Sequence, residues 1–307
     1  MDDAHIGTEQ HSTYFAPKPV MVILTMLLFI LFFLVAGKAL LLLAANFRGV
    51  GLHEALTIDE NSSIGSRYFV RAALFVNHSL IFLLPAVLTL WLFYKKNSLK
   101  AACLQKLPDL STLMLGLLFV MSAFPLAQEA FLANKWLVEQ FPALQTWVNT
   151  EKLAVKMMEG LLVMNSPWEM VASLVVMAVV PAVGEELVFR GIGQRKLIES
   201  TGKPALGVAL TAVIFSITHF EIQRFLAILL LGCVLGLLFY WTKNLWIPIA
   251  AHFLNNGAQV VIAWLNQDKI NKIKDGAGED LPMTVILASA AVFVATGFIL
   301  WKERSSD

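Results

Sequence analysis

Eight apolar stretches recur along the chain, separated by more polar segments. Each is near the roughly 20 residues that a helix needs to cross the hydrocarbon core of a bilayer. Inside that core, a helix is one of the few structures that pair every backbone N–H and C=O group internally. The sequence therefore predicts an all-α polytopic membrane protein with about eight transmembrane helices. The expected spans are residues 20–45, 69–94, 110–126, 167–198, 204–220, 225–242, 245–265 and 282–301.

The composition agrees with this fold class. Hydrophobic residues make up 58% of the chain and charged residues 15%, whereas a soluble domain is about a quarter charged. The net charge of +1 comes without a basic domain or stripe, which argues against a nucleic-acid partner. Cys103 and Cys233 lie far apart in the sequence and fit no metal or disulfide pattern. The lipid bilayer is therefore the expected environment.

The chain is expected to form a single membrane domain over residues 1–307. Aromatic residues and methionines alternate with Glu and Lys over residues 128–166, a pattern typical of amphipathic helices at the membrane interface. Residues 1–17 lack a basic segment and precede an apolar run too long for a signal peptide, so we expect that run to be retained. The predicted parts are the first three spans at 20–127, the interfacial insert at 128–166, a core of four spans at 167–265 and a last span at 282–301.

The loop charges predict the orientation. An even number of spans places both termini on one side of the membrane. The short basic loops at 95–106, 190–203 and 243 and the tail after 301 fall on that same side. Loops rich in Lys and Arg stay in the cytoplasm, so both termini are predicted to be cytoplasmic. The size of the chain and the lack of an endoplasmic-reticulum retention signal favour a bacterial plasma membrane.

The most unusual stretch is Val-Gly-Glu-Glu-Leu-Val-Phe-Arg, residues 183–190, which places three ionisable groups inside an apolar segment. Ionisable groups at such depth are rare, costly and usually functional. Glu186 and Arg190 are four residues apart, so they are expected to pair on one helix. Glu185 lies about 100° round the same helix. It therefore needs a partner from another helix.

Helix register brings further polar residues to the height of Glu185. Counted from a turn at residues 199–203, Glu185 lies about 14 residues, or roughly 21 Å, back along its helix. His219 lies about 16 residues, or roughly 24 Å, forward along the next. On the seventh span, His252 and Asn256 are four residues apart and share a face. Phe215 shares a face with His219 in the same way. The four polar groups are thus expected to meet in one pocket between three helices.

Such a cluster suits hydrolysis. A carboxylate beside an imidazole can hold and deprotonate a water molecule. A second imidazole and an amide can donate hydrogen bonds to a tetrahedral oxyanion. Each residue alone has a structural explanation, since buried histidines and asparagines often join helices. Their convergence at compatible heights favours a catalytic interpretation.

The motifs also carry a family resemblance. Glu185-Glu186-x-x-x-Arg190, Phe215-x-x-x-His219 and His252-x-x-x-Asn256 follow one another in separate apolar segments. In this order they resemble the CPBP intramembrane proteases, which comprise the type II CAAX prenyl endopeptidases and the Abi-type bacterial proteins linked to bacteriocin processing and self-immunity. The resemblance covers about residues 168–265.

The resemblance implies a role for each residue. Glu185 and His219 would activate the water, and His252 and Asn256 would bind the oxyanion. The residues expected to support the site are Glu186, Arg190 and Phe215. The substrate would be a membrane-embedded or lipid-anchored protein or peptide, with a prenylated CAAX terminus as one form.

Two mechanisms have been described for this family, a metalloprotease and a metal-independent glutamate protease. The glutamate type, without a cofactor, is preferred here. A zinc ion would take Glu185, His219 and His252 as its three protein ligands, and their spacing leaves that alternative open.

Two non-proteolytic functions also use these residues. A proton-coupled transporter would relay protons through the same buried Glu and His. It would favour repeated, broken spans, and the sequence shows no internal repeat. A non-catalytic bacteriocin-immunity membrane protein would use the pocket only to hold helices together.

Overall fold

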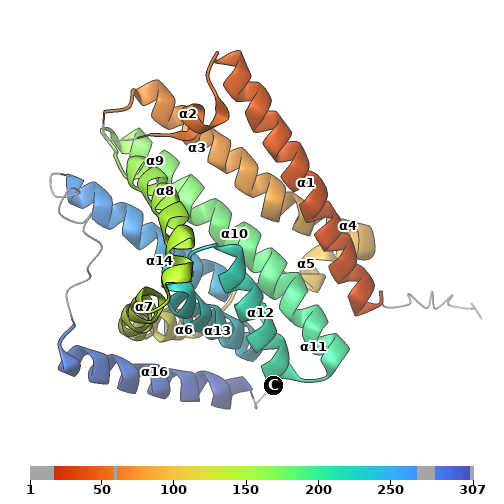
Figure 1. Ribbon diagram of the computed structural model, residues 1–307. Coiled ribbons are helices and arrows are strands. Elements are labelled where there is room, and N and C mark those ends of the chain that lie inside the picture. The colour runs from red at the N-terminus through yellow and green to blue at the C-terminus, as the bar shows by residue number, and fades with distance from the viewer. Residues whose placement is uncertain (1–16, 59–60, 268–280, 305–307) are drawn as a thin grey trace, which may run out of the picture.

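The computed structural model describes residues 17–58, 61–267 and 281–304, and every regular element in them is a helix (Figure 1). The predicted all-α class is therefore confirmed. Residues 1–16, for which the sequence predicts no cleaved signal peptide, and most of the loop before the last span lie outside the described residues.

Within the described residues, six helical stretches are long and apolar enough to cross a membrane, which marks the chain as an integral multi-pass membrane protein. The other two predicted spans also form helices. One has only 15 residues. The other has 20 residues but is more polar, because it carries a histidine, two asparagines and a glutamine. The six are Pro19–Phe47, Ile64–Ala101, Leu110–Glu139, Pro167–Thr201, Ile222–Thr242 and Met283–Glu303.

The N-terminal helices form one side of the molecule (Figure 1). Most large apolar side chains of the first helix are exposed, as expected for a surface that faces lipid. The second predicted span is one helix with a π-helical turn, η1, directly before Pro85, because the ring nitrogen of a proline has no N–H to continue the α-helical pattern. The elements are α1 (Pro19–Phe47), α2 (Leu52–Leu56), α3 (Ile64–His78), η1 (Ser79–Leu83), α4 (Leu84–Tyr94), η2 (Lys95–Asn97) and α5 (Ser98–Ala101).

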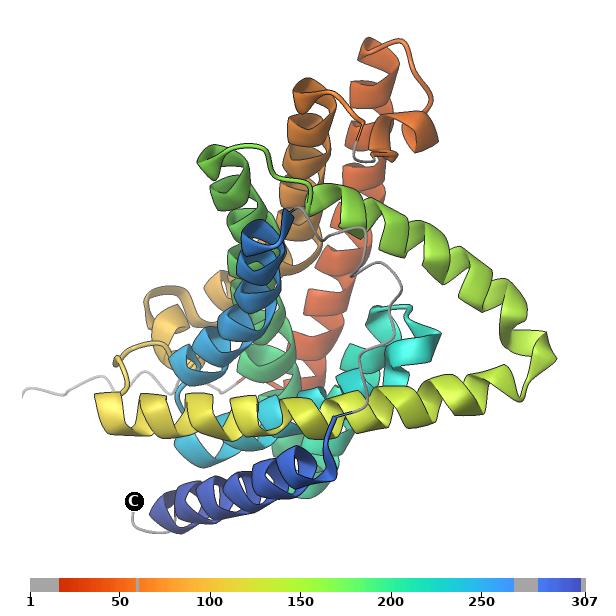
Figure 2. The ribbon, with the colours of Figure 1, turned by 90° about the vertical axis from the view of Figure 1, so that its left-hand side faces the viewer.

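The third span extends beyond its predicted end at residue 126. Figure 2 shows α6 (Leu110–Ser122) and α7 (Phe124–Glu139) as one nearly straight rod. The predicted boundary between residues 127 and 128 falls inside α7, and the division of the chain at this point stays a prediction. A slight break lies near Pro125, and α7 continues along α13 despite its polar residues. After η3 (Pro142–Leu144), α8 (Gln145–Leu161) folds back from this rod. Its place at a membrane interface stays a prediction.

The fourth span is a continuous helical stretch that carries the Glu-Glu motif. It ends at Gly202, whose φ of +66° closes the helix in the left-handed conformation. A π-helical turn again precedes a proline, Pro181. The elements are α9 (Pro167–Leu174), η4 (Val175–Val179), α10 (Val180–Glu186), η5 (Leu187–Gln194), a π-helical segment, and α11 (Arg195–Thr201).

The remaining helices complete the core. α12 packs against α11 beyond the predicted turn, and α13 packs along α12. In Figure 1, α5, the α11–α12 turn and the C-terminal end lie toward the side where α1 begins. This grouping is what the loop charges predict, while the cytoplasmic orientation stays a prediction. The elements are α12 (Pro204–Thr218), η6 (Ile222–Arg224), α13 (Phe225–Thr242), α14 (Trp246–Leu265) and α16 (Met283–Glu303).

A buried ionic cluster joins α3 to α9. Both oxygens of Glu169 are engaged: Oε1 lies 2.8 Å from Arg67 Nε and 3.0 Å from Arg71 Nη1, and Oε2 accepts from the backbone N–H of Asn165. The Arg71 side chain also donates to the carbonyl of Leu161. Buried charges of this kind are stable only when paired and hydrogen-bonded. The cluster therefore sets the position of α3 against the helix that carries the Glu-Glu motif.

Close packing between α11 and α12 at Gly207 predicts that an added side chain there would destabilise the protein. A Cβ at Gly207 would overlap Cγ1 of Ile198. Gly207→Ala is therefore expected to lower the free energy of unfolding by about 1–3 kcal/mol, as overpacking does. Gly65→Ala is the matched control, because its nearest atom, Ser63 Oγ, lies 3.8 Å away. Unfolding titrations of both variants in detergent would check this, and equal stability of the two would contradict the packing.

Candidate active site

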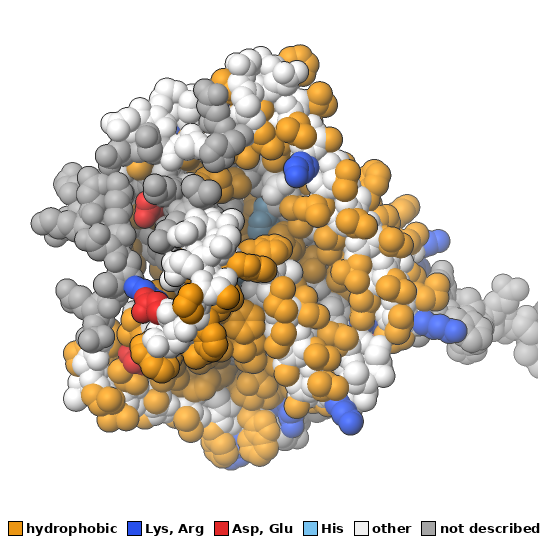
Figure 3. Space-filling view, in the orientation of Figure 1, with side chains coloured by type: hydrophobic (Ala, Val, Ile, Leu, Met, Phe, Trp, Pro, Cys, Tyr) orange, Lys and Arg blue, Asp and Glu red, His pale blue; other side chains and the backbone are white. Residues whose placement is uncertain are grey.

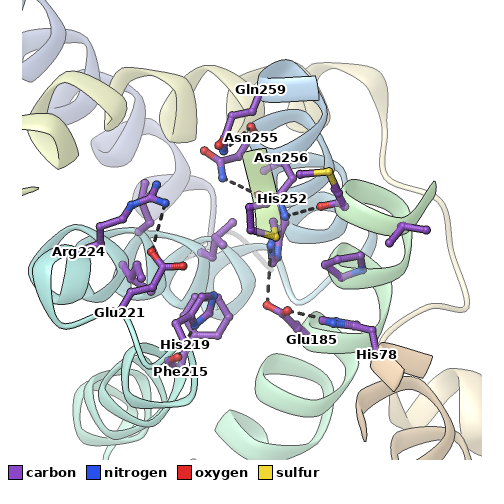
Figure 4. Close-up of a pocket in the computed structure, with 18 of the residues that line it drawn as sticks. His78, Glu185, Phe215, His219, Glu221, Arg224, His252, Asn255, Asn256 and Gln259 are labelled. Carbon is purple, nitrogen blue, oxygen red and sulfur yellow. Dashed lines mark hydrogen bonds and ion pairs between the residues drawn. The ribbon is translucent and has the colours of Figure 1, made fainter. Parts of the chain in front are cut away.

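Glu185 and Glu186 end α10 and point in different directions. Both are buried. Glu186 faces Arg190 and α14, and Glu185 lines a cavity of about 310 Å³ (Figure 4). A helical step of about 100° separates neighbouring side chains, which explains why adjacent carboxylates serve different surroundings. The prediction that they diverge is confirmed.

The predicted pair of Glu186 and Arg190 is present. Arg190 Nη1 donates to Glu186 Oε1 at 2.6 Å, and both side chains are fully buried. Arg190 Nη2 donates to the carbonyl of Gly232 on α13, and the guanidinium lies 4.5 Å from the ring centroid of Phe215. Both terminal nitrogens of this buried arginine thus have acceptors, while its Nε has no hydrogen-bond partner among the described residues. It thereby joins three helices behind the cavity.

His252 connects the two glutamates. Its Nδ1 lies 2.9 Å from Glu186 Oε1, and its Nε2 lies 3.9 Å from Glu185 Oε2. A carboxylate accepts only, so Nδ1 carries the proton that is donated to Glu186. The second nitrogen is then aimed at Glu185 and the cavity. A hydrogen bond at one imidazole nitrogen orients the other in this way at many sites.

Asn256 lines the same cavity, one turn along α14. Its Nδ2 donates to the carbonyl of Met177 at 3.2 Å. In an α-helix this carbonyl would accept from the N–H of residue 181. Residue 181 is Pro181, which has no N–H, so the carbonyl is available to Asn256. Asn255 donates to Asn256 Oδ1 at 2.8 Å. These two bonds hold the Asn256 amide, which keeps its second N–H hydrogen.

His219 directly follows α12 and also lines the cavity. Its Nδ1 lies 2.7 Å from the carbonyl of Phe215, and the Phe215 ring packs edge-on with ring centroids 4.5 Å apart. Because a carbonyl only accepts, Nδ1 carries the proton and Nε2 is left for another partner. Among the described contacts, none joins His219 directly to Glu185. The structure thus places the predicted residues on one cavity and brings His252, rather than His219, to the carboxylate.

The sequence reasoning missed His78. This residue ends α3, and its Nε2 lies 3.2 Å from Glu185 Oε1 (Figure 4). The available signal was a histidine next to an asparagine, Asn77, inside the mainly apolar stretch at residues 69–94, which also carries Arg71. The expectation that Glu185 needs partners from other helices is confirmed, by α3 and α14. The roles predicted for the individual side chains stay predictions.

The predicted zinc ligands do not fit a metal site as placed. Across the residues that the structure describes, no three His, Cys, Asp or Glu side chains are grouped so that they could hold a metal ion. Glu185 and His252 face each other, but His219 turns Nδ1 to its own helix. No step is therefore assigned to a metal here.

Apolar side chains surround much of the cavity. Its wall includes Leu74 from α3, Ile228, Leu231 and Leu235 from α13, and Val176 from η4. Figure 3 shows histidine surface at the bottom of a hollow, with mainly hydrophobic side chains around it. The cavity thus combines a large apolar wall with polar side chains, which include the charged Glu221 and Arg224.

Comparison with known proteins finds similarity in the helices that carry the predicted site residues. Residues 167–258 match the family described as "Type II CAAX prenyl endopeptidase Rce1-like". A Bacillus subtilis (strain 168) protein named "Putative membrane peptidase YdiL" is 32% identical over 89 residues, which are 29% of this chain and 36% of that protein. The match thus spans about a third of the length of that relative. No solved structure matches the chain significantly.

The matched segment contains all three motifs, from Glu185 to Asn256, on the helices that surround the cavity. It begins at Pro167, where α9 begins, and ends within α14. Residues 167–258 thus match the Rce1-like type II CAAX prenyl endopeptidase family, which is the CPBP family that the motifs of this chain resemble.

Proposed function

We propose that this protein is an intramembrane endopeptidase in which Glu185 activates water to hydrolyse a peptide bond. The observation that carries the proposal is the state of Glu185 Oε2. This buried oxygen has no hydrogen-bond partner among the described residues, and it faces His252 Nε2 inside the cavity. Glu186 Oε2 also lacks a partner among the described residues, but of the two carboxylates Glu185 lines the cavity, where a ligand can reach its unpaired oxygen. Water or a substrate group would satisfy it.

In this mechanism a water molecule binds between Glu185 and His219. Glu185 Oε2 takes a proton as the water oxygen bonds to the carbonyl carbon of the substrate, and a tetrahedral oxyanion forms. The same proton then passes to the nitrogen of the leaving amine, and the C–N bond breaks. Proton transfer by a positioned side chain contributes about 10²–10⁴-fold to such rates. No covalent intermediate is formed.

His252 and Asn256 are assigned to the oxyanion. When both nitrogens of His252 are protonated, Nδ1 donates to Glu186 and Nε2 donates into the cavity. The carboxylates of Glu185 and Glu186 lie on either side of this positive imidazolium. With Arg190 paired to Glu186, the two negative and two positive charges balance. The second N–H hydrogen of the Asn256 amide supplies the other donor. Donors held in place before the reaction lower the barrier most, because they need no reorganisation.

The proposed substrate is a lipid-anchored protein or peptide, with a prenylated cysteine near its C-terminus. The apolar wall of the cavity supports it, because an isoprenoid chain binds to such surfaces by the hydrophobic effect. The family description supports it as well.

The test uses the purified full-length protein in lipid vesicles. A farnesylated peptide that ends in Cys-Ala-Ala-X and the same peptide without the lipid are offered, and products are identified by mass spectrometry. Release of the last three residues from the lipidated peptide is expected. Proton-driven uptake into vesicles without cleavage of either peptide would instead favour the transporter alternative. If neither cleavage nor uptake is observed, the result would favour the immunity-protein alternative.

Metal dependence has its own expected outcome. Activity of the vesicle preparation is expected to survive prolonged dialysis against a strong zinc chelator, because the mechanism uses only protein groups. Loss of activity on dialysis, restored by added zinc, would contradict the glutamate mechanism and favour the metalloprotease alternative.

A further inference from the structure

His78 lies outside the segment that matches the family, yet it touches the proposed base. The residue ends α3, whereas the match begins at residue 167. Its ring packs on Phe82 with centroids 4.6 Å apart, so its orientation is held from behind. Its Nε2 lies 3.2 Å from Glu185 Oε1, at ion-pair distance, and has no hydrogen-bond partner of better geometry among the described residues (Figure 4). A group fixed by packing can present its nitrogen in one direction.

The contact makes the two oxygens of Glu185 unequal. Oε1 has the imidazole nitrogen of His78 at 3.2 Å. Oε2 has His252 Nε2 only at 3.9 Å and no hydrogen-bond partner among the described side chains. A carboxylate rotates easily about its last torsion, since that torsion has broad minima. The imidazole at Oε1 restricts this rotation and leaves Oε2 toward the cavity.

The backbone around His78 is built for this approach. η1 packs directly on Gly184, where a Cβ would lie 3.1 Å from Cβ of Phe82 and 3.3 Å from the backbone nitrogen of Leu83. The absence of a side chain at Gly184 thus lets η1 come close to the residue before Glu185. On the same face of α3, Arg67 and Arg71 bind Glu169. The Glu169 cluster near the start of α3 and the close packing of η1 on Gly184 after its end thus fix α3 against the helix of the Glu-Glu motif.

We infer that His78 is a positioning residue of the proposed peptidase. The 3.2 Å contact of its Nε2 with Glu185 Oε1 holds the carboxylate so that Oε2 receives the proton of the attacking water. The inference rests on the proposed function, because it assigns a task at the same site. A misplacement of about 1 Å at a reacting group can cost about a hundredfold in rate, which sets the scale of the expected effect.

The test compares His78→Gln with His78→Asn. The Gln amide nitrogen reaches about the place of imidazole Nε2, whereas the Asn nitrogen stops near the place of Nδ1. Both variants keep a polar side chain, so they are expected to fold alike. For the farnesylated peptide, His78→Asn is expected to lower kcat about tenfold to a hundredfold with little change in KM. His78→Gln is expected to restore most of the activity.

Ser79→Ala is the matched control on the next residue. It removes a buried hydroxyl that has no partner among the described residues, and it is expected to keep wild-type kcat. Thermal unfolding of each variant shows whether the fold is retained. Wild-type kcat in His78→Asn, or equal losses in the Asn and Gln variants, would overturn the inference.

The same assay separates this inference from the proposed function. If Glu185→Gln stays active, the proposed function is wrong and the inference is lost with it. If Glu185→Gln is inactive while His78→Asn matches the wild type, only the inference is wrong.

Discussion

Glu185→Gln is expected to lower kcat for hydrolysis of the farnesylated peptide by about 10²–10⁴-fold, the contribution of a positioned general base. The amide has nearly the same shape as the carboxylate, so substrate binding and KM should change little. It cannot accept and return the proton, and that transfer is needed in both halves of the reaction. The measurement is a steady-state assay in lipid vesicles, with products quantified by mass spectrometry.

A second glutamine variant controls for the loss of charge on the same helix. Glu199 lies on α11, pairs with Lys196 and is 40% exposed at its side chain. Glu199→Gln is expected to keep wild-type kcat, because exposed pairs contribute little to structure. Comparable activity of Glu185→Gln and Glu199→Gln would remove Glu185 from the mechanism.

Arg190→Met is expected to lower the free energy of unfolding by about 3–5 kcal/mol, the cost of breaking a buried ion pair on one side. The substitution keeps much of the volume but leaves Glu186 as an uncompensated buried charge. It also removes the donor to the carbonyl of Gly232 and the cation over the ring of Phe215. Unfolding titrations in mixed detergent micelles would measure the loss.

The double variant Glu186→Gln/Arg190→Met distinguishes the stability of the pair from its role in the site. Removing both charges is expected to recover much of the lost stability, as replacement of whole buried pairs often does. Hydrolysis should stay low, because His252 Nδ1 loses the carboxylate that orients it. Recovery of both stability and activity would contradict the link between Glu186 and His252.

The two adjacent glutamates thus have different tasks in one helix. Glu186 is held by Arg190 and in turn orients His252. Glu185 is left with one oxygen contacted by His78 and the other open to the cavity. We expect this division because Glu186 Oε1 is already bonded to Arg190 and His252 and Glu186 does not line the cavity, whereas Glu185 Oε2 does and is available to water.

Local features of this protein could be predicted from the sequence. The apolar runs predict the helices, because only paired backbone groups are stable in lipid. The pairing of Glu186 with Arg190 and the turn at Gly202 follow from helix geometry within a few residues. The shared faces of Phe215 with His219, and of His252 with Asn256, follow from the same geometry. The family of the core was also recognisable from these motifs.

Contacts between distant segments were decided only by the tertiary structure. The α3 position of His78 beside Glu185 depends on the ionic cluster at Glu169 and on the close packing of η1 at Gly184. Spacing along a chain predicts which residues share a helix face. It does not predict how two helices slide and rotate against each other, since that depends on the packing of every side chain between them. For that reason the sequence indicated which residues would meet in the pocket, and the fold determined which imidazoles touch the carboxylate.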